Sequence, residues 1–209
     1  MYFGLSEDQI FFQDNVKKFL VDQLPLETIK KITEGKDVLA KEELHKSLIS
    51  LGINNILIPE KNGGLGLDLL FATAVSQSLG EGIATLPFLG PYIVAPTAIK
   101  YGASDNQKEK LYSKMSQNLM NFGIGFSEYF GSRDSSGLNI SDKKVTGKTL
   151  FVLDVDFATH VMVSDEGGQI GIVSLDSDGI EMIDLITVDK TRTFTEMHFV
   201  DTPIEVLDK

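Results

Sequence analysis

The pattern of apolar residues changes near residue 120, and this change constrains the fold more than any other feature of the sequence. Before it, apolar residues such as Ile10, Val16 and Leu20 recur at helical spacing. After residue 121 the spacing approaches two, which is typical of β-strands. The sequence therefore predicts an α+β fold, with an N-terminal helical domain over residues 1–120 and a small antiparallel β-barrel or sandwich domain over residues 121–209.

Capping residues and helix breakers predict where the helices begin and end. Ser6 and Gln9 form a capping-box pattern, and Pro25 ends the helix that follows. Asp68 is a second N-cap candidate, and Gly80 terminates the helix after it. Together with the first helix, the predicted helices are Lys41–Leu51, Leu69–Leu79, a buried helix from about Pro91 to Tyr101, and Asn106–Gln117.

Short apolar runs separated by turn residues predict the strands of the second half. Clusters of Asp, Ser and Gly at residues 134–137, 165–168 and 176–179 indicate turns. The segment Val161–Leu175 is typical of a β-hairpin. The predicted strands are Phe122–Phe126, Leu138–Ile140, Thr149–Val155, His160–Ser164, Gln169–Leu175 and Thr193–Asp201.

Charge and composition exclude several classes of function. The formal charge of −11 argues against a nucleic-acid partner, because phosphate backbones require clustered Lys and Arg. An anionic ligand would need a local site, since the overall field repels it. There is no cysteine, which excludes disulfides and thiolate chemistry. No signal peptide and no apolar run of about 20 residues is present, so we expect a soluble cytoplasmic protein without a membrane segment.

A glycine-rich segment, Leu51–Leu67, stands out within the helical half. Its apolar part, Ile53–Ile58, predicts a short strand, and Pro59 and three glycines follow. The glycines do not match a dinucleotide-binding fingerprint, because Leu69 stands where a third glycine of the pattern is required. The segment therefore predicts a turn at positive φ that leads into the next helix.

The residues that most often carry metals or catalysis form no recognisable motif. The three histidines are far apart in the sequence, so no metal site is predicted. Two aspartates and a glycine near residue 178 lack the other ligands of a calcium loop and are typical of a hairpin turn. No nucleophile-elbow pattern is present. The three histidines are His45, His160 and His198. The sequence alone therefore predicts no catalytic residue and no metal ligand.

The segment Gly123–Gly137 is the strongest binding motif. A predicted strand ends at Ser127, and a loop with Gly131 and Ser132 follows, so hydroxyls and backbone N–H groups are exposed together. Such a loop can bind a phosphate or the polar edge of a ring system. An ordinary β-turn also accounts for this pattern, and the residues alone leave both interpretations open.

Five segments in order resemble the acyl-CoA dehydrogenase family over nearly the whole chain. The resemblance begins with LSEDQIFFQDNVKKFL at residues 5–20 and continues through LGINNILIPEKNGGLGL at 51–67. It extends over residues 78–118, where GASDNQKEKLYSKM is similar to the family's Gly-Thr-x-x-Gln-Lys region. The segment 123–134 corresponds to the family's TEP-type loop. The last, VTGKTLFVLDVDFATHVMVSD at 145–165, is similar to the strand that contacts the flavin.

This resemblance implies an FAD enzyme that oxidises an acyl-CoA thioester at Cα and Cβ. It places Phe126 and Ser127 beside the flavin ring, and Gly131 and Ser132 nearer the phosphates. The family's flavin-stacking strand corresponds to three consecutive residues. These residues are Phe151, Val152 and Leu153. Phe151 replaces the usual Trp, whereas Leu153 lacks the hydroxyl that forms a hydrogen bond near flavin N5 in the family.

Members of this family carry the catalytic glutamate on a C-terminal four-helix bundle, for which these 209 residues contain no counterpart. We therefore expect this chain to be part of an FAD-dependent acyl-CoA dehydrogenase, inactive alone and associated in a homo- or hetero-oligomer. An acyl-CoA oxidase or flavin-dependent monooxygenase on the same fold is a close variant. The alternative is a non-catalytic subunit that keeps the fold to bind a partner or an acyl chain.

Overall fold

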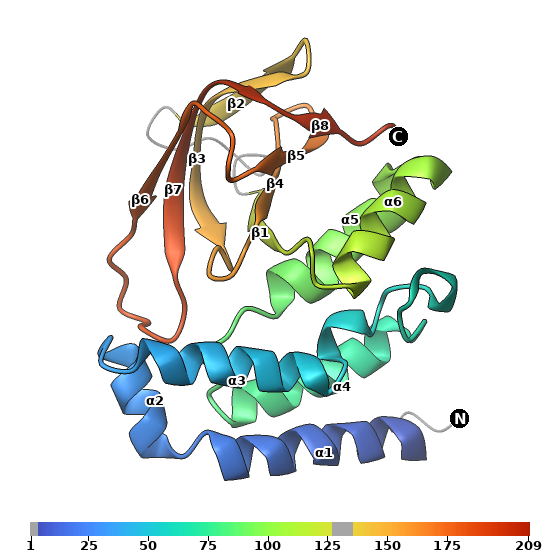
Figure 1. The fold of residues 1–209 in the computed structure, drawn as a ribbon, viewed down its shortest axis with the longest axis vertical. Coiled ribbons are helices and arrows are strands. Elements are labelled where there is room, and N and C mark those ends of the chain that lie inside the picture. Colours follow the sequence, from blue (N-terminus) through green and yellow to red (C-terminus); the bar gives the residue numbers. More distant parts are fainter. Residues whose placement is uncertain (1–3, 127–135) are drawn as a thin grey trace.

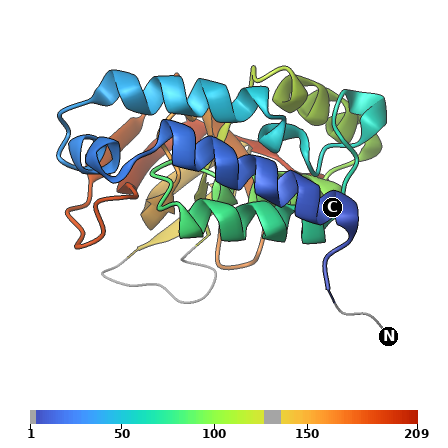
Figure 2. The same cartoon turned by 90° about the horizontal axis from the view of Figure 1, so that it is seen from below.

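The computed structural model describes residues 4–126 and 136–209, which form a layer of helices followed by a sheet (Figure 1). The α+β class predicted from the sequence is confirmed. Figure 2 views the helical layer from below, with α1 running alongside α3 and α4. The helices are α1 (Glu7–Gln23), α2 (Leu26–Thr33), α3 (Val38–Ser50), α4 (Leu69–Glu81), α5 (Ala95–Gly102) and α6 (Asp105–Ser116), with short turns η1 (Ile53–Asn55), η2 (Glu60–Asn62) and η3 (Gly90–Val94).

The helix starts predicted at Ser6 and Asp68 are confirmed by their capping hydrogen bonds, whereas the helix predicted from Lys41 begins earlier, at Val38. The Ser6 hydroxyl accepts from the Gln9 N–H, and the Gln9 side chain accepts in return from the Ser6 N–H. The Asp68 carboxylate accepts from the first free N–H groups of α4. Helix α2 was not predicted. Pro25, which ends α1, also stands at the N-cap of α2, where its missing N–H costs nothing.

The strand predicted over Ile53–Ile58 is wrong, because this segment forms the turn η1. An isolated strand would leave its backbone groups unpaired. Instead the glycine segment folds back over it, and Leu65, Gly66 and Leu67 donate their N–H groups to carbonyls of residues 55–58. A Cβ at Gly64 would lie 2.0 Å from the Ile58 carbonyl oxygen, so only glycine fits there.

The described residues of the second half form one eight-stranded sheet in the order β6-β7-β3-β1-β4-β5-β8, with β2 paired to β3. The pairing of β1 with β4 is parallel, so the sheet is mixed and not purely antiparallel as predicted. The predicted hairpin is confirmed as β4–β5. The strands are β1 (Phe122–Gly125), β2 (Gly137–Ser141), β3 (Lys144–Leu153), β4 (His160–Ser164), β5 (Ile170–Ser174), β6 (Ile180–Asp184), β7 (Phe194–Pro203) and β8 (Glu205–Val206).

Two strands, β6 and β8, were missed by sequence analysis. Strand β6 has four exposed residues among its five, so it shows no buried alternating pattern. Strand β8 has only two residues, too few to display a period. Each strand forms because it pairs with a neighbour, β6 with β7 and β8 with β5. This pairing cannot be predicted from the local sequence.

Three apolar clusters hold the molecule together, and one of them is shared by both halves. The first lies among α1 to α4 and the third within the sheet. The second joins Ile99 of α5 and Leu111 of α6 to Phe122 of β1 and Met162 of β4, all of them fully buried. The division at residue 120 as two separately folding domains stays a prediction, since this cluster spans it.

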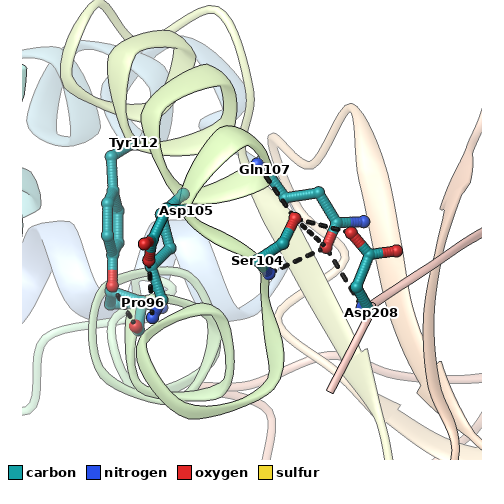
Figure 3. A network of polar contacts seen from close by, with 7 residues as sticks. Pro96, Ser104, Asp105, Gln107, Tyr112 and Asp208 are labelled. Carbon is teal, nitrogen blue, oxygen red and sulfur yellow. Dashed lines mark hydrogen bonds and ion pairs between the residues drawn. The ribbon is translucent and has the colours of Figure 1, made fainter.

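The last described residues return to the helical half and dock on α6 (Figure 3). Ser104, the N-cap of α6, donates its hydroxyl proton to the Asp208 carboxylate, and Asp208 N–H donates to the Gln107 side chain at 3.1 Å. A carboxylate at the N-terminus of a helix is favoured by the helix dipole. No helix in the described part of the chain is long and apolar enough to cross a membrane.

Candidate functional site

Of the predicted binding residues, Phe151 lies on β3 and Phe126 directly follows the neighbouring strand β1. Strands β1 and β3 are antiparallel, and Ile124 pairs with Leu153. Phe126 lies two residues after Ile124 and Phe151 two residues before Leu153, so the register brings them to the same stretch of the sheet. The other predicted residues, Ser127, Gly131 and Ser132, lie outside the described residues.

A β-bulge near the end of β3 displays the Phe151 ring. Thr149 pairs with Met197 and Val152 with Thr195, so β3 holds one more residue than β7 between these pairs. Phe151 has a φ of +54° and its side chain is 45% exposed, whereas Val152 is fully buried. A positive φ is rare for an aromatic residue, and such strain concentrates at functional sites.

Gly125 allows β1 to approach this bulge closely. A Cβ at Gly125 would lie 3.2 Å from two Thr149 side-chain atoms and 3.3 Å from Val152 Cγ2. Gly125 therefore faces the two residues that flank the bulge. A larger residue here would push β1, and Phe126 after it, away from β3.

The described residues fit one side of a flat aromatic ligand. Phe151 offers an exposed ring on which another ring can stack. Phe126 is half-buried and packs against the shared apolar cluster. Val152 is buried in the sheet core, so a contact from it would come from its backbone. Leu153 contributes no side-chain hydrogen bond, so polar atoms of a ligand here would meet backbone groups.

The turn after β3 is fixed to the helical half by a buried carboxylate. Asp154 is 4% exposed and accepts a 2.7 Å hydrogen bond from the Gly90 N–H in η3. Burial raises the pKa of Asp154, while the Gly90 N–H and the Arg192 guanidinium act in the opposite direction. Its φ of +60° is one that Asp tolerates better than most residues.

A pocket of about 300 Å³, lined in part by apolar side chains, lies beside this turn, between α4, residues 82–89 and the β6–β7 connection. Leu89 in its wall precedes Gly90, and Arg192 at its rim lies two residues before Phe194, which pairs with Leu153. The pocket is at the lower end of the range for small-molecule sites, roughly 300–1,000 Å³. Its apolar side chains are Leu79, Ile83, Leu86, Phe88 and Leu89.

A second acidic residue of the same turn ties this pocket to α3. Asp156 accepts from Lys41 of α3 at 2.8 Å and from the Thr193 hydroxyl of the β6–β7 connection. In Figure 1 this connection reaches the helical layer beside α2 and α3. Asp154, Asp156 and Arg192 were not predicted from the sequence. The available signal was two acids directly after an apolar strand, but nothing local indicated their partners.

An aromatic contact completes the join between the two halves. The His45 ring stacks on Phe157 with centroids 4.2 Å apart, and His45 Nε2 lies 3.0 Å from the Tyr92 hydroxyl. Burial, and after it the charge of Lys41, lower the pKa of His45 to about 4, while Asp156 acts in the opposite direction. Burial also raises the pKa of Tyr92. This histidine is therefore neutral near pH 7 and packs as an aromatic side chain.

The glycine segment belongs to a different part of the molecule. It lines a separate pocket of about 510 Å³ with Lys100 of α5 and with Lys108 and Tyr112 of α6. Its glycines shape the fold of the loop and do not contact the bulge at Phe151 in any described interaction. Among the described residues, no group of three or more His, Asp or Glu side chains has metal-binding geometry.

Comparison with known proteins agrees with this architecture. Residues 6–118 match the model of the acyl-CoA dehydrogenase N-terminal domain. No curated protein sequence matches the chain. Among solved structures, it is similar to acyl-CoA dehydrogenase from Geobacillus kaustophilus, with a TM-score of 0.81 and 19% identity over 100% of this chain and 60% of that one.

Two heteromeric relatives have a similar fold. A variant of the Tcur3481-Tcur3483 steroid ACAD gives a TM-score of 0.81 at 18% identity, covering 96% of this chain and 57% of that one. The ChsE4-ChsE5 complex from Mycobacterium tuberculosis gives 0.74 at 17% identity, covering 100% and 58%. This chain thus spans less than two thirds of the length of the structures it resembles, and at these identities the similarity concerns the fold alone.

Proposed function

This chain belongs to the acyl-CoA dehydrogenase family, and from that premise we propose that it forms the N-terminal and middle part of a flavin-dependent member acting on an acyl-CoA thioester. When bound, FAD would accept the hydride from the substrate. The protein residues would bind and orient the reactants. The observation that carries the proposal is the Phe151 ring, held exposed by a bulge at positive φ.

Each binding residue predicted from the sequence has a part in this proposal. Phe151 would stack on one face of the isoalloxazine ring, with Phe126 on the adjoining strand. Backbone groups of Val152 and Leu153 would meet its polar edge. Ser127 and the loop with Gly131 and Ser132 would contact the ring and the phosphates. The pocket beside Leu89 would hold the acyl group away from water.

The base that removes the α-proton would come from outside the described site. The lining of the apolar pocket includes no carboxylate among the residues that the structure describes. Asp154 is close by, but it is buried and already accepts from Gly90. We therefore propose that catalysis needs a further protein segment or a partner subunit, in a homo- or hetero-oligomer.

Binding of FAD to the purified chain tests this proposal. We expect a bound-flavin visible spectrum that Phe151→Ala weakens several-fold, because ring stacking contributes about 0.5–1.5 kcal/mol beyond area burial. Ser127→Ala should weaken it as well. Phe11→Ala removes an aromatic ring that is 69% exposed on α1 and serves as the matched control. A spectrum of free flavin throughout, with circular dichroism showing an intact fold, would contradict the proposal.

A non-catalytic subunit is the second candidate, and two observations favour it. Leu153 has no hydroxyl where the flavin-binding strand of the family has one. Ile186 and Val188 in the β6–β7 connection are fully exposed, as expected of side chains that a partner covers. Under this alternative the chain binds a partner or an acyl chain without FAD, so the flavin experiment separates the two candidates.

A further inference from the structure

The β6–β7 connection, residues 185–193, brings a cation to the rim of an otherwise apolar pocket. Thr191 and Arg192 face the pocket wall formed by α4 and residues 82–89. Arg192 is the one charged residue among those that line this pocket in the described structure. The remaining lining residues are apolar or small, such as Leu79, Phe88 and Gly80. The pocket therefore combines several apolar side chains with a single guanidinium in its lining.

The Arg192 guanidinium has no acceptor of its own in the described part of the chain. It forms no ion pair or hydrogen bond there and is exposed. The acids that feel its charge are already engaged: Asp154 accepts from Gly90, and Asp189 accepts from Thr191. A guanidinium carries five N–H donors in a planar fork that matches a carboxylate or phosphate. These donors are therefore available to a ligand.

The residues on both sides of Arg192 are anchored. Before it, the Asp189 carboxylate accepts from both the N–H and the hydroxyl of Thr191. After it, the Thr193 hydroxyl donates to Asp156, which also pairs with Lys41 of α3. These contacts restrain the loop on both sides of Arg192 before any ligand arrives, which lowers the entropy cost of binding.

We propose that Arg192 recognises an anionic group on the ligand of this pocket, and that Asp156 positions it through Thr193. The inference rests on the proposed function, because an acyl-CoA thioester supplies both an apolar group and anionic oxygens. A net charge of −11 repels anions from the molecule as a whole, so such a ligand needs a local cation. The anion is either a carboxylate at the far end of the acyl group or a phosphate of the CoA moiety.

Three probes distinguish these sources by isothermal titration of the full chain: hexanoyl-CoA, the mono-CoA thioester of adipic acid, and free CoA. If the anion is an acyl carboxylate, the adipic thioester binds about 10-fold to 100-fold more tightly than hexanoyl-CoA, and Arg192→Met abolishes that difference. If the anion is a phosphate of CoA, Arg192→Met weakens the binding of all three probes by a similar factor. Lys190→Met removes a cation from the same loop, outside the pocket lining, and should change neither pattern.

The outcomes separate this inference from the proposed function. Thioester binding that is the same in wild type and Arg192→Met overturns the role of Arg192 and leaves the proposed function standing. Failure of the folded wild type to bind either thioester overturns both.

The positioning role of Asp156 is tested through Thr193, whose side chain is exposed and can be replaced at little cost to folding. Thr193→Val removes the hydroxyl at nearly constant shape. In this variant, Arg192→Met should change the affinity for the probes several-fold less than it does in wild type. Thr193→Ser keeps the hydroxyl and should restore the wild-type effect. If Thr193→Val keeps the wild-type affinities for all probes, Asp156 does not position Arg192.

Discussion

Among the contacts that join the two halves of this molecule, two differ in kind. One is apolar and joins Ile99 and Leu111 of α5 and α6 to Phe122 and Met162 of the sheet. The other, at the turn after β3, is made of directed interactions: the Gly90–Asp154 hydrogen bond, the Lys41–Asp156 ion pair and the stacking of His45 on Phe157.

The two contacts have different roles: the apolar one stabilises the fold, and the polar one fixes the geometry of the site. Apolar burial is strong but non-directional, so the apolar contact holds the halves together without fixing atomic positions at the site. Hydrogen bonds add less free energy but require defined distances. The polar contact lies beside the pocket and the bulge, so it sets their geometry. Substitutions at four positions test this division, from the largest expected loss of stability to the smallest.

Truncating the apolar contact should have the largest effect on stability. Phe122 is fully buried in the shared cluster, so Phe122→Ala should lower the free energy of unfolding by about 3–5 kcal/mol. Urea unfolding followed by circular dichroism measures this. Phe11→Ala, on the exposed face of α1, should cost less than about 0.5 kcal/mol. A similar small loss for Phe122→Ala would show that the shared cluster does not hold the halves together.

The hydrogen bond at Asp154 should rank second. Asp154→Ala leaves the buried Gly90 N–H without an acceptor and should cost about 1–3 kcal/mol. Asp154→Asn keeps an acceptor oxygen, tolerates the positive φ and removes a buried charge, so it should stay within about 1 kcal/mol of wild type. The same unfolding measurement compares them. Equal losses in both variants would mean that the charge matters and the hydrogen bond does not.

The buried histidine should make the polar contact sensitive to pH. Its folded-state pKa is lowered to about 4, chiefly by burial, from an ordinary value of about 6.5. The unfolded chain therefore binds a proton between these values that the folded chain does not. The stabilisation by neutral His45 is complete above about pH 6.5 and is lost as the pH falls toward about 4.

Replacing His45 with glutamine, which does not titrate, removes this dependence. Between about pH 7 and pH 5, wild type should lose on the order of 1 kcal/mol more stability than His45→Gln, after allowance for solvent screening. Burial raises the pKa of Asp154, which acts with the opposite sign in both proteins and cancels in the comparison. Parallel pH profiles for the two proteins would show that the His45 ring is solvated.

Much of the fold could be predicted from the sequence, because local chemistry determines it. The capping box at Ser6, the N-cap at Asp68 and the β4–β5 hairpin depend on residues a few positions apart. The wrong strand at Ile53–Ile58 and the missed β6 have one physical cause. Whether a short segment is a strand depends on a partner strand, and pairing is a long-range property that apolar content does not report.

The candidate site was less predictable from the sequence. The importance of Phe151 followed from family resemblance, but its positive φ depends on a bulge defined by the register with β7. Arg192 lies 103 to 113 positions from the pocket wall residues Leu79 and Leu89. Only the folded chain brings a cation from one half to an apolar pocket of the other.

Replacing Phe151 should change the stability least, and it gives the sharpest test of the comparison. Its ring is 45% exposed and its φ of +54° favours glycine, so Phe151→Gly relieves backbone strain while losing little packing. We expect the free energy of unfolding to stay within about 1 kcal/mol of wild type, because these two terms oppose each other. Flavin affinity, measured by titration with FAD, should nonetheless fall several-fold as the stacking surface is lost. Phe122→Ala would show the converse, a large loss of stability. If Phe151→Gly unfolds the chain, the bulge is part of the core and stability and geometry are not separable here.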